Sequence, residues 1–86
     1  MPVKPVRISS HARFEMSRRS IRPGEVVRIV RHPGQVLPSI KRREIYQSLI
    51  GPARRMLLRV VVKELAGAYL VTVYKTSKVA RYWRTP

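Results

Sequence analysis

The stretch MLLRVVVKEL, residues 56–65, decides the fold of this 86-residue chain. It is apolar over most of its length and carries three β-branched valines in a row, Val60, Val61 and Val62. Such residues favour strands, and a nearly continuous apolar run is typical of a strand that is buried on both faces. Residues 56–65 are therefore predicted to form the central strand of a sheet.

Three weaker strands are predicted around this centre. Residues 44–50 alternate in polarity, and residues 68–75 form a β-rich run after a turn at Gly67. Residues 36–40 are interrupted by Pro38, and a proline confines a strand to the edge of a sheet. Residues 51–55, with the sequence GPARR, are expected to be a loop.

The N-terminal half carries helical signals. Ser9 and Ser10 are good N-caps for a helix over residues 11–19. A second helix is predicted to begin at Pro23 and to end at His32, because Pro33 and Gly34 follow. The predicted fold class is α+β, with two N-terminal helices packed on a three- to four-stranded antiparallel sheet. The single domain 1–86 would comprise an extended arm or edge strand (1–8), a helical hairpin (9–33), an antiparallel sheet (36–75) and a basic-aromatic tail (76–86).

The composition points to a polyanionic partner. Nineteen residues are Lys or Arg and only four are acidic, which gives a formal net charge of +15. So much like charge on a small domain repels itself unless an anion neutralises it. The four Glu residues are scattered, which argues against a carboxylate site for Mg²⁺. There is no Cys, so disulfides and Cys-based zinc sites are excluded. No cofactor and no metal are expected.

The basic residues gather in clusters, which could form a positive cradle for phosphates. The predicted nucleic-acid-binding residues are Arg18, Arg22, Lys41, Arg42, Arg43, Arg54, Arg55, Lys78, Arg81 and Tyr82. Tyr82 lies among the C-terminal charges and could stack on a base or pack into the core. Trp83 is more typical of a lid folded over the sheet. The alternative for the clusters is a solvated surface of unrelated charges, and genome composition or growth at high temperature also enriches Arg.

His11 is the candidate general base. It lies in the first turn of the predicted helix, where the helix dipole favours a neutral imidazole. Glu15 lies one turn further and could orient His11, or form the more common salt bridge with Arg19. A single His at a helix start is most often structural, and His32 is better explained as a cap at a helix end.

The chain resembles a widespread family of small bacterial domains that is grouped with toxins of the BrnT and RelE type. The motifs that carry the resemblance are Ser10-His11-Ala12, Met16, Arg19, Ile21, a helix ending near Pro33, Tyr46 and Thr72-Val73-Tyr74. They extend over roughly residues 11–75. The resemblance implies a RelE/BrnT-like, microbial-RNase-like fold and a toxin-like, metal-independent endoribonuclease of a type II toxin–antitoxin system. The catalytic residues would be His11, Arg19, Tyr46, Tyr74 and Lys75, with Arg43 also stabilising phosphate charge.

The expected partners are RNA, free or ribosome-bound, and a protein antitoxin with an acidic surface. Glu15 departs from the family pattern, because a basic residue often occupies that place. The alternative function is a non-enzymatic RNA- or DNA-binding module associated with the ribosome or the nucleoid. This function explains the charge and the aromatic residues equally well. A cytoplasmic location is expected, because the first residues lack the apolar run of a signal peptide and no stretch approaches the ~20 apolar residues that span a bilayer. No membrane partner is expected.

Overall fold

The computed structural model describes residues 5–65 and 67–84. The elements, in chain order, are β1 (Val6–Ile8), α1 (Ser10–Arg18), α2 (Pro23–Arg31), β2 (Gln35–Pro38), β3 (Glu44–Ile50), a 3₁₀ turn (Pro52–Arg54), β4 (Met56–Leu65), β5 (Ala68–Thr76) and α3 (Val79–Tyr82). The first half of the predicted N-terminal arm, residues 1–4, and the last two residues of the predicted tail lie outside the described residues.

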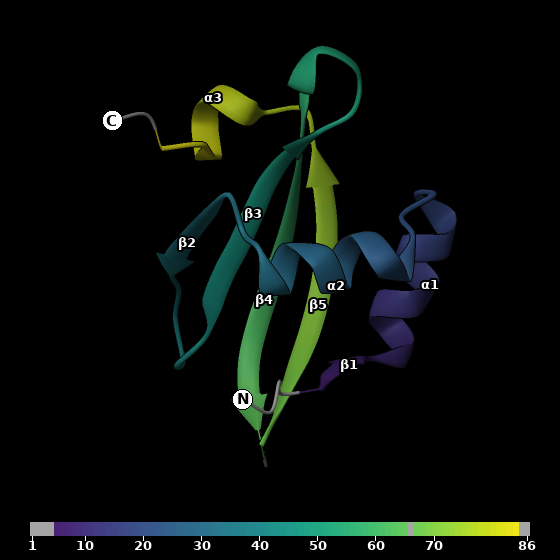
Figure 1. Ribbon diagram of the computed structural model, residues 1–86, viewed down its shortest axis with the longest axis vertical. Helices are drawn as coiled ribbons and strands as arrows, with labels where there is room; N and C mark the ends of the chain where they lie inside the picture. The colour runs from purple at the N-terminus through teal and green to yellow at the C-terminus, as the bar shows by residue number, and fades with distance from the viewer. Residues whose placement is uncertain (1–4, 66, 85–86) are drawn as a thin grey trace.

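The predicted fold class is wrong in its sheet and in its helices, although the domain is α+β. In the described part of the chain the sheet has five strands in the order β1-β5-β4-β3-β2. It is mixed, because β1 runs parallel to β5 while the other neighbours are antiparallel. A third helix, α3, follows the sheet (Figure 1). The predicted antiparallel sheet of three or four strands under two helices is thereby corrected.

β1 is the edge strand that was one of the two expectations for residues 1–8, whereas its pairing with β5 and the helix α3 were not predicted. The reason for the error is the length of these two elements. β1 has three residues and α3 has four, so neither contains enough residues to show a hydrophobic period. Both are held by contacts that are distant in sequence. Tyr69 N donates to Pro5 O (2.9 Å) beside β1, and Gln47 Nε2 donates to Tyr82 O (3.1 Å) in α3.

α1 begins at its predicted cap. The Ser9 hydroxyl accepts a hydrogen bond from Ala12 N at 3.0 Å, which satisfies one of the free amides of the first turn. Ala12 and Met16, four residues apart, are buried and form the narrow packing side of the helix. The helix ends at Arg18, one residue before the predicted end, and Ser20 then adopts a positive φ of 57°.

α2 supplies the wide apolar side of the helical layer. Pro23 lies in its first turn, as predicted, and the helix ends before His32, which occupies the C-cap. Val26, Ile29 and Val30 are buried against the sheet. In Figure 1, α2 crosses in front of the central strands and α1 stands beside β5.

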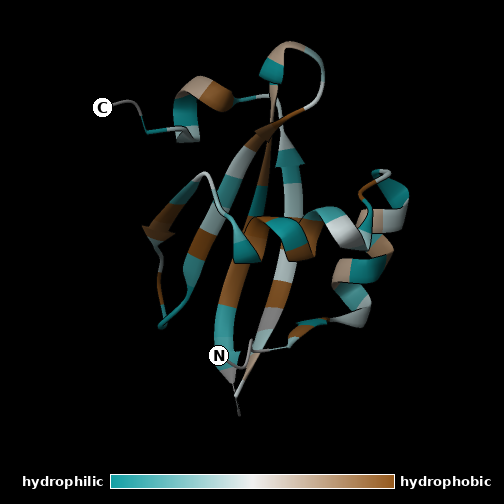
Figure 2. Ribbon diagram, viewed as in Figure 1, coloured by the Kyte–Doolittle hydropathy of each residue, from teal (hydrophilic) through white to brown (hydrophobic). Residues whose placement is uncertain are grey.

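β4 is the central strand of the sheet, which confirms the prediction for residues 56–65. Its side chains Leu58, Val60 and Val62 join the core beneath the helices, opposite Val71 and Val73 of β5. Figure 2 shows apolar bands along the strands of the sheet. The residues between them, such as Leu57 and Arg59, point to the opposite face, which α1 and α2 leave uncovered. We call this second side the Arg59 face.

The edge strand β2 carries Pro38 at its end, as its sequence predicts. Of the helices that the structure describes, none combines the length and the apolar character needed to cross a membrane.

Candidate functional site

A groove lies where α1 runs beside β5. β1 pairs with β5 only opposite Tyr69, Leu70 and Val71, and the chain then turns into α1. From Thr72 onward α1 therefore replaces a neighbouring strand. The α1–β5 groove has a volume of about 360 Å³ and is lined by His11, Glu15, Arg19, Thr72, Val73 and Tyr74.

This groove brings together three of the five predicted catalytic residues. His11, Glu15 and Arg19 recur at every fourth position, which places them on one side of α1. Tyr74 comes from β5, more than fifty residues later in the chain. A potential base, a cation and a phenol thus line one cavity.

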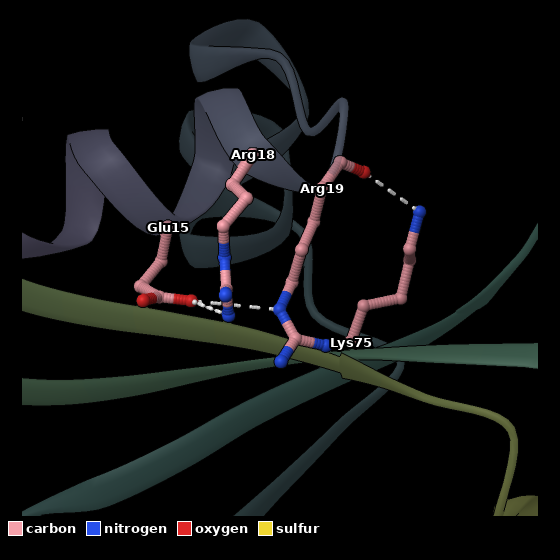
Figure 3. A network of polar contacts seen from close by, with 4 residues as sticks. All are labelled: Glu15, Arg18, Arg19 and Lys75. Carbon is pink, nitrogen blue, oxygen red and sulfur yellow. Dashed lines mark hydrogen bonds and ion pairs between the residues drawn. The ribbon is translucent and has the colours of Figure 1, made fainter.

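Glu15 forms the ion pairs that its spacing favours. Its Oε2 lies 3.0 Å from Arg18 Nη2 and 3.6 Å from Arg19 Nε (Figure 3). Burial raises the pKa of this carboxyl, but the two guanidinium groups outweigh that effect and the pKa is lowered overall. Of the two alternatives left open for Glu15, the salt bridge is the one that forms. The carboxylate reduces the positive charge that Arg19 presents to the groove.

Lys75 has a structural contact rather than a place in the groove. Its Nζ donates a hydrogen bond of 3.0 Å to the carbonyl oxygen of Arg19, at the end of α1 (Figure 3). A cation at this point satisfies a free carbonyl and suits the negative end of the helix dipole. Lys75 thereby ties the end of α1 to β5 and holds Arg19 beside the groove.

Tyr46 lies away from the groove. It is partly buried and packs against the core beneath the helices. Burial, followed by the nearby Glu44 and Tyr69, raises the pKa of its phenol. A phenol in this state stays protonated and lies apart from His11, Arg19 and Tyr74. The structure therefore does not join Tyr46 to the other predicted catalytic residues.

A row of polar side chains crosses the Arg59 face. Gln35, Gln47, Arg59 and Tyr74 are direct neighbours in register on β2, β3, β4 and β5. Gln47 Nε2 donates to Gln35 Oε1 at 2.8 Å, Arg59 Nε donates to Gln47 Oε1 at 2.9 Å, and Arg59 Nη1 donates to Tyr74 Oη. The ring of Tyr82 covers the guanidinium, with 4.2 Å from Cζ to the ring centroid. We call these five residues the Arg59 network.

Arg59 is the functional candidate that the sequence reasoning missed. It is only 6% exposed, and all the partners that the structure gives its guanidinium are uncharged: two amide or hydroxyl oxygens and two aromatic rings. Burying a cation without a carboxylate is costly, so such a group often marks a functional site. The signal in the sequence is a single Arg within the apolar run of residues 56–62.

Tyr74 connects the two features. Tyr74 lines the α1–β5 groove, and its hydroxyl oxygen accepts a hydrogen bond from Arg59. Because that oxygen is held by a guanidinium, its own proton remains available for donation to a bound group.

The predicted nucleic-acid-binding residues do not form one continuous cradle. Lys41, Arg42 and Arg43 form the β2–β3 turn, whereas Arg54 and Arg55 lie in the β3–β4 loop. These turns lie at opposite ends of β3, whose seven residues span roughly 23 Å. Figure 1 shows α3 near the same end of the sheet as the β3–β4 loop. The C-terminal residues of this end are Lys78, Arg81, Tyr82 and Arg84.

The remaining predicted binding residues, Arg18 and Arg22, flank the turn between α1 and α2 and are exposed. His32 occupies the C-cap of α2, as predicted, and lines a separate pocket between α2 and β3. Among the described residues, no group of three or more His, Asp or Glu side chains could hold a metal ion. No family model, no curated protein and no solved structure matches this chain.

Proposed function

We propose that this protein binds RNA and cleaves it without a metal ion, as a toxin-like endoribonuclease. The observation that carries the proposal is the α1–β5 groove, where His11, Arg19 and Tyr74 line one cavity. The net charge of +15 supports a polyanionic substrate. The resemblance to BrnT and RelE toxins points to the same activity, to a cytoplasmic location and to an acidic protein antitoxin.

The chemistry assigns one role to each of the three residues. His11 removes the proton from a ribose 2′-hydroxyl, whose oxygen then attacks the adjacent phosphorus. Arg19 stabilises the negative charge of the five-coordinate phosphorane. Tyr74, held by Arg59, donates its proton to the departing 5′-oxygen as the P–O5′ bond breaks. The products are a 2′,3′-cyclic phosphate and a free 5′-hydroxyl.

A labelled single-stranded RNA in the presence of EDTA tests this assignment. Wild-type protein should cleave it, and His11→Ala should reduce the rate by about 10²- to 10⁴-fold, the usual contribution of a general base. The matched control is His32→Ala, because His32 lies in a different pocket and its replacement should not change the cleavage rate. Tyr74→Phe should also slow cleavage, provided that its unfolding midpoint shows an intact fold.

One observation favours a second function, a non-enzymatic RNA-binding module. The Glu15 carboxylate binds Arg18 and Arg19, so the ion pairs in the described part of the chain leave His11 without an orienting carboxylate. Salt-sensitive binding of RNA that stays intact, in wild type and in His11→Ala alike, would establish this second function. Equal loss of cleavage in His11→Ala and His32→Ala would contradict the proposed roles of the groove.

A further inference from the structure

A further cavity lies outside the groove and outside the Arg59 network. It has a volume of about 780 Å³ and is lined by Arg54, Arg55, Ser77, Val79, Ala80 and Trp83. We call it the Trp83 pocket. Its walls come from the β3–β4 loop and from the segment around α3, two parts of the chain that are distant in sequence.

The loop that supplies the two arginines has an unusual backbone. Ala53 and Arg54 have positive φ values of 57° and 52°, a region that residues other than glycine rarely adopt. The loop keeps this shape through hydrogen bonds from Arg54 N to Gly51 O (3.1 Å) and from Arg55 N to Pro52 O (3.4 Å). Strained positions of this kind gather at ligand sites, where the surrounding structure fixes them.

The pocket is positively charged on one side. Arg54 and Arg55 are both exposed, and no acidic side chain is among the described residues that line the cavity. Two guanidinium groups in adjacent positions match the geometry of a phosphate, because each can donate two hydrogen bonds to its oxygens.

The opposite wall is aromatic and fixed in place. Trp83 N donates to Val79 O at 2.8 Å, which anchors the backbone to α3. The indole is half-buried, and the far edge of its ring lies against Gly34: a Cβ on that glycine would be 3.0 Å from Trp83 Cη2. The predicted lid role of Trp83 therefore describes only part of this residue, since Trp83 also lines the cavity.

We propose that the Trp83 pocket binds one nucleotide unit of a single-stranded nucleic acid, with the base against Trp83 and the phosphate between Arg54 and Arg55. The inference rests on the proposed RNA-directed function and adds a recognition site to it. Flat aromatic rings accept any base, and the neighbouring Val79 and Ala80 complete an apolar wall. The Ser77 hydroxyl could accept or donate one hydrogen bond to the base edge or the sugar.

The chain offers a direct readout, because Trp83 is its only tryptophan. We expect adenosine 5′-monophosphate to quench the fluorescence of the full-length protein saturably. Adenosine without a phosphate should bind at least tenfold more weakly, and inorganic phosphate should cause little quenching. The double variant Arg54→Gln/Arg55→Gln should weaken binding of the monophosphate at least tenfold and leave that of adenosine nearly unchanged.

The matched control is Lys41→Gln/Arg42→Gln, which removes the same charge at the far end of β3. It should not change the affinity for adenosine 5′-monophosphate. Equal weakening in both double variants would overturn the proposal, since it would show a general charge effect. Absence of saturable quenching, or equal binding of phosphate and monophosphate, would also overturn it. The Trp83→Ala substitution should weaken nucleotide binding, measured by calorimetry, about 5- to 150-fold. This is the range expected for the loss of a stacked base.

The failure of this inference can be distinguished from failure of the proposed function. If the wild type cleaves or binds single-stranded RNA while the Arg54→Gln/Arg55→Gln variant does so equally well, only the pocket assignment is wrong. If the wild type binds the monophosphate but neither binds nor cleaves RNA, the pocket stands and the proposed function is wrong.

Discussion

At the scale of single residues, the β2–β3 turn places charge where the backbone would prefer glycine. Lys41 and Arg42 have φ values of 55° and 60°, and Arg43 N closes the turn on Ile40 O at 3.1 Å. Two successive positive φ angles define a type I′ turn, for which Asn-Gly is the favoured pair. We predict that Arg42→Gly raises the free energy of unfolding by about 0.5–1 kcal/mol, because glycine adopts this conformation without a steric penalty.

Urea unfolding monitored by circular dichroism measures this change as a higher midpoint. Arg43→Gly is the control: Arg43 is the next residue but has no positive φ, so its replacement should lower the stability. If both variants lose stability, backbone strain at Arg42 is not significant.

Glu15 gives a second prediction at this scale, concerning pH. Its pKa in the folded protein is lowered overall by Arg18 and Arg19, despite the opposing effect of burial. Because this pKa is lowered, the ionised carboxyl stabilises the fold at pH values above the ordinary pKa of about 4 for a glutamate. This contribution disappears as the pH falls through the pKa that Glu15 has in the folded protein. Glu15→Gln should therefore be less stable than wild type at pH 7 and equally stable near pH 2.

The same comparison in a background of Arg18→Gln/Arg19→Gln provides the control. Without its two partners, the substitution at Glu15 should lose its pH dependence, as a double-mutant cycle would show. A pH-dependent difference that survives in this background would assign the effect to another charge.

At the scale of elements, α3 is attached to the sheet by two kinds of contact. Gln35 holds Arg84, accepting from its N–H at 3.0 Å and donating to its carbonyl oxygen, and Trp83 packs on Gly34. Gly34→Ala would place its Cβ 3.0 Å from Trp83 and 3.1 Å from the backbone oxygen of Gln47, which cannot move without distorting β3. We predict a loss of about 1–3 kcal/mol in unfolding free energy and a red shift of Trp83 fluorescence.

Gly24→Ala is the matched control for that substitution. Gly24 lies in the first turn of α2, and a Cβ there would meet nothing within 4 Å. Alanine should be neutral or stabilising by up to about 1 kcal/mol, because it favours a helix more than glycine does. If Gly34→Ala were equally well tolerated, Trp83 would not be packed on Gly34 as described.

The elements also show how far the sequence could predict this fold. β3, β4, β5 and α2 have seven or more residues and carry a clear local pattern, and each lies close to its predicted range. β1 is the edge strand that was one of two expectations for residues 1–8, but its pairing with β5 and the parallel direction of that pairing depend on where α1 leads the chain. Such information is tertiary, and no pattern in three residues contains it.

The candidate site was predictable to a similar extent. His11 and Tyr74 could be singled out from the sequence, but their meeting in one groove depends on the point at which β1 ends. Arg59 was missed because β4 is buried on both faces, so its sequence does not alternate and gives no sign of which residues share a face. The row from Gln35 to Tyr74 exists only through the register of four strands, which a shift of one residue would destroy.

At the scale of the whole molecule, the basic clusters at the two ends of β3 provide a test of where a polyanion binds. The structure places Arg54, Arg55 and Lys78 near α3, and Lys41, Arg42 and Arg43 at the opposite turn. Replacing either triplet by glutamine removes three charges from the net +15, so the two triple variants have the same formal charge. Any difference between them in RNA binding then reports location and not total charge.

We predict that only the first triple variant changes the salt dependence of RNA binding substantially. Each phosphate contact with single-stranded nucleic acid contributes roughly −0.7 to the slope of log K against log salt concentration, so the loss of three contacts should reduce its magnitude by about 2. The measurement is fluorescence anisotropy of a labelled single-stranded RNA at several salt concentrations, with unfolding midpoints to verify that both variants fold. Equal reductions in both variants would show that RNA binds diffusely over the whole positive surface. A reduction confined to the Lys41, Arg42 and Arg43 variant would place the RNA at the opposite end, away from the Trp83 pocket.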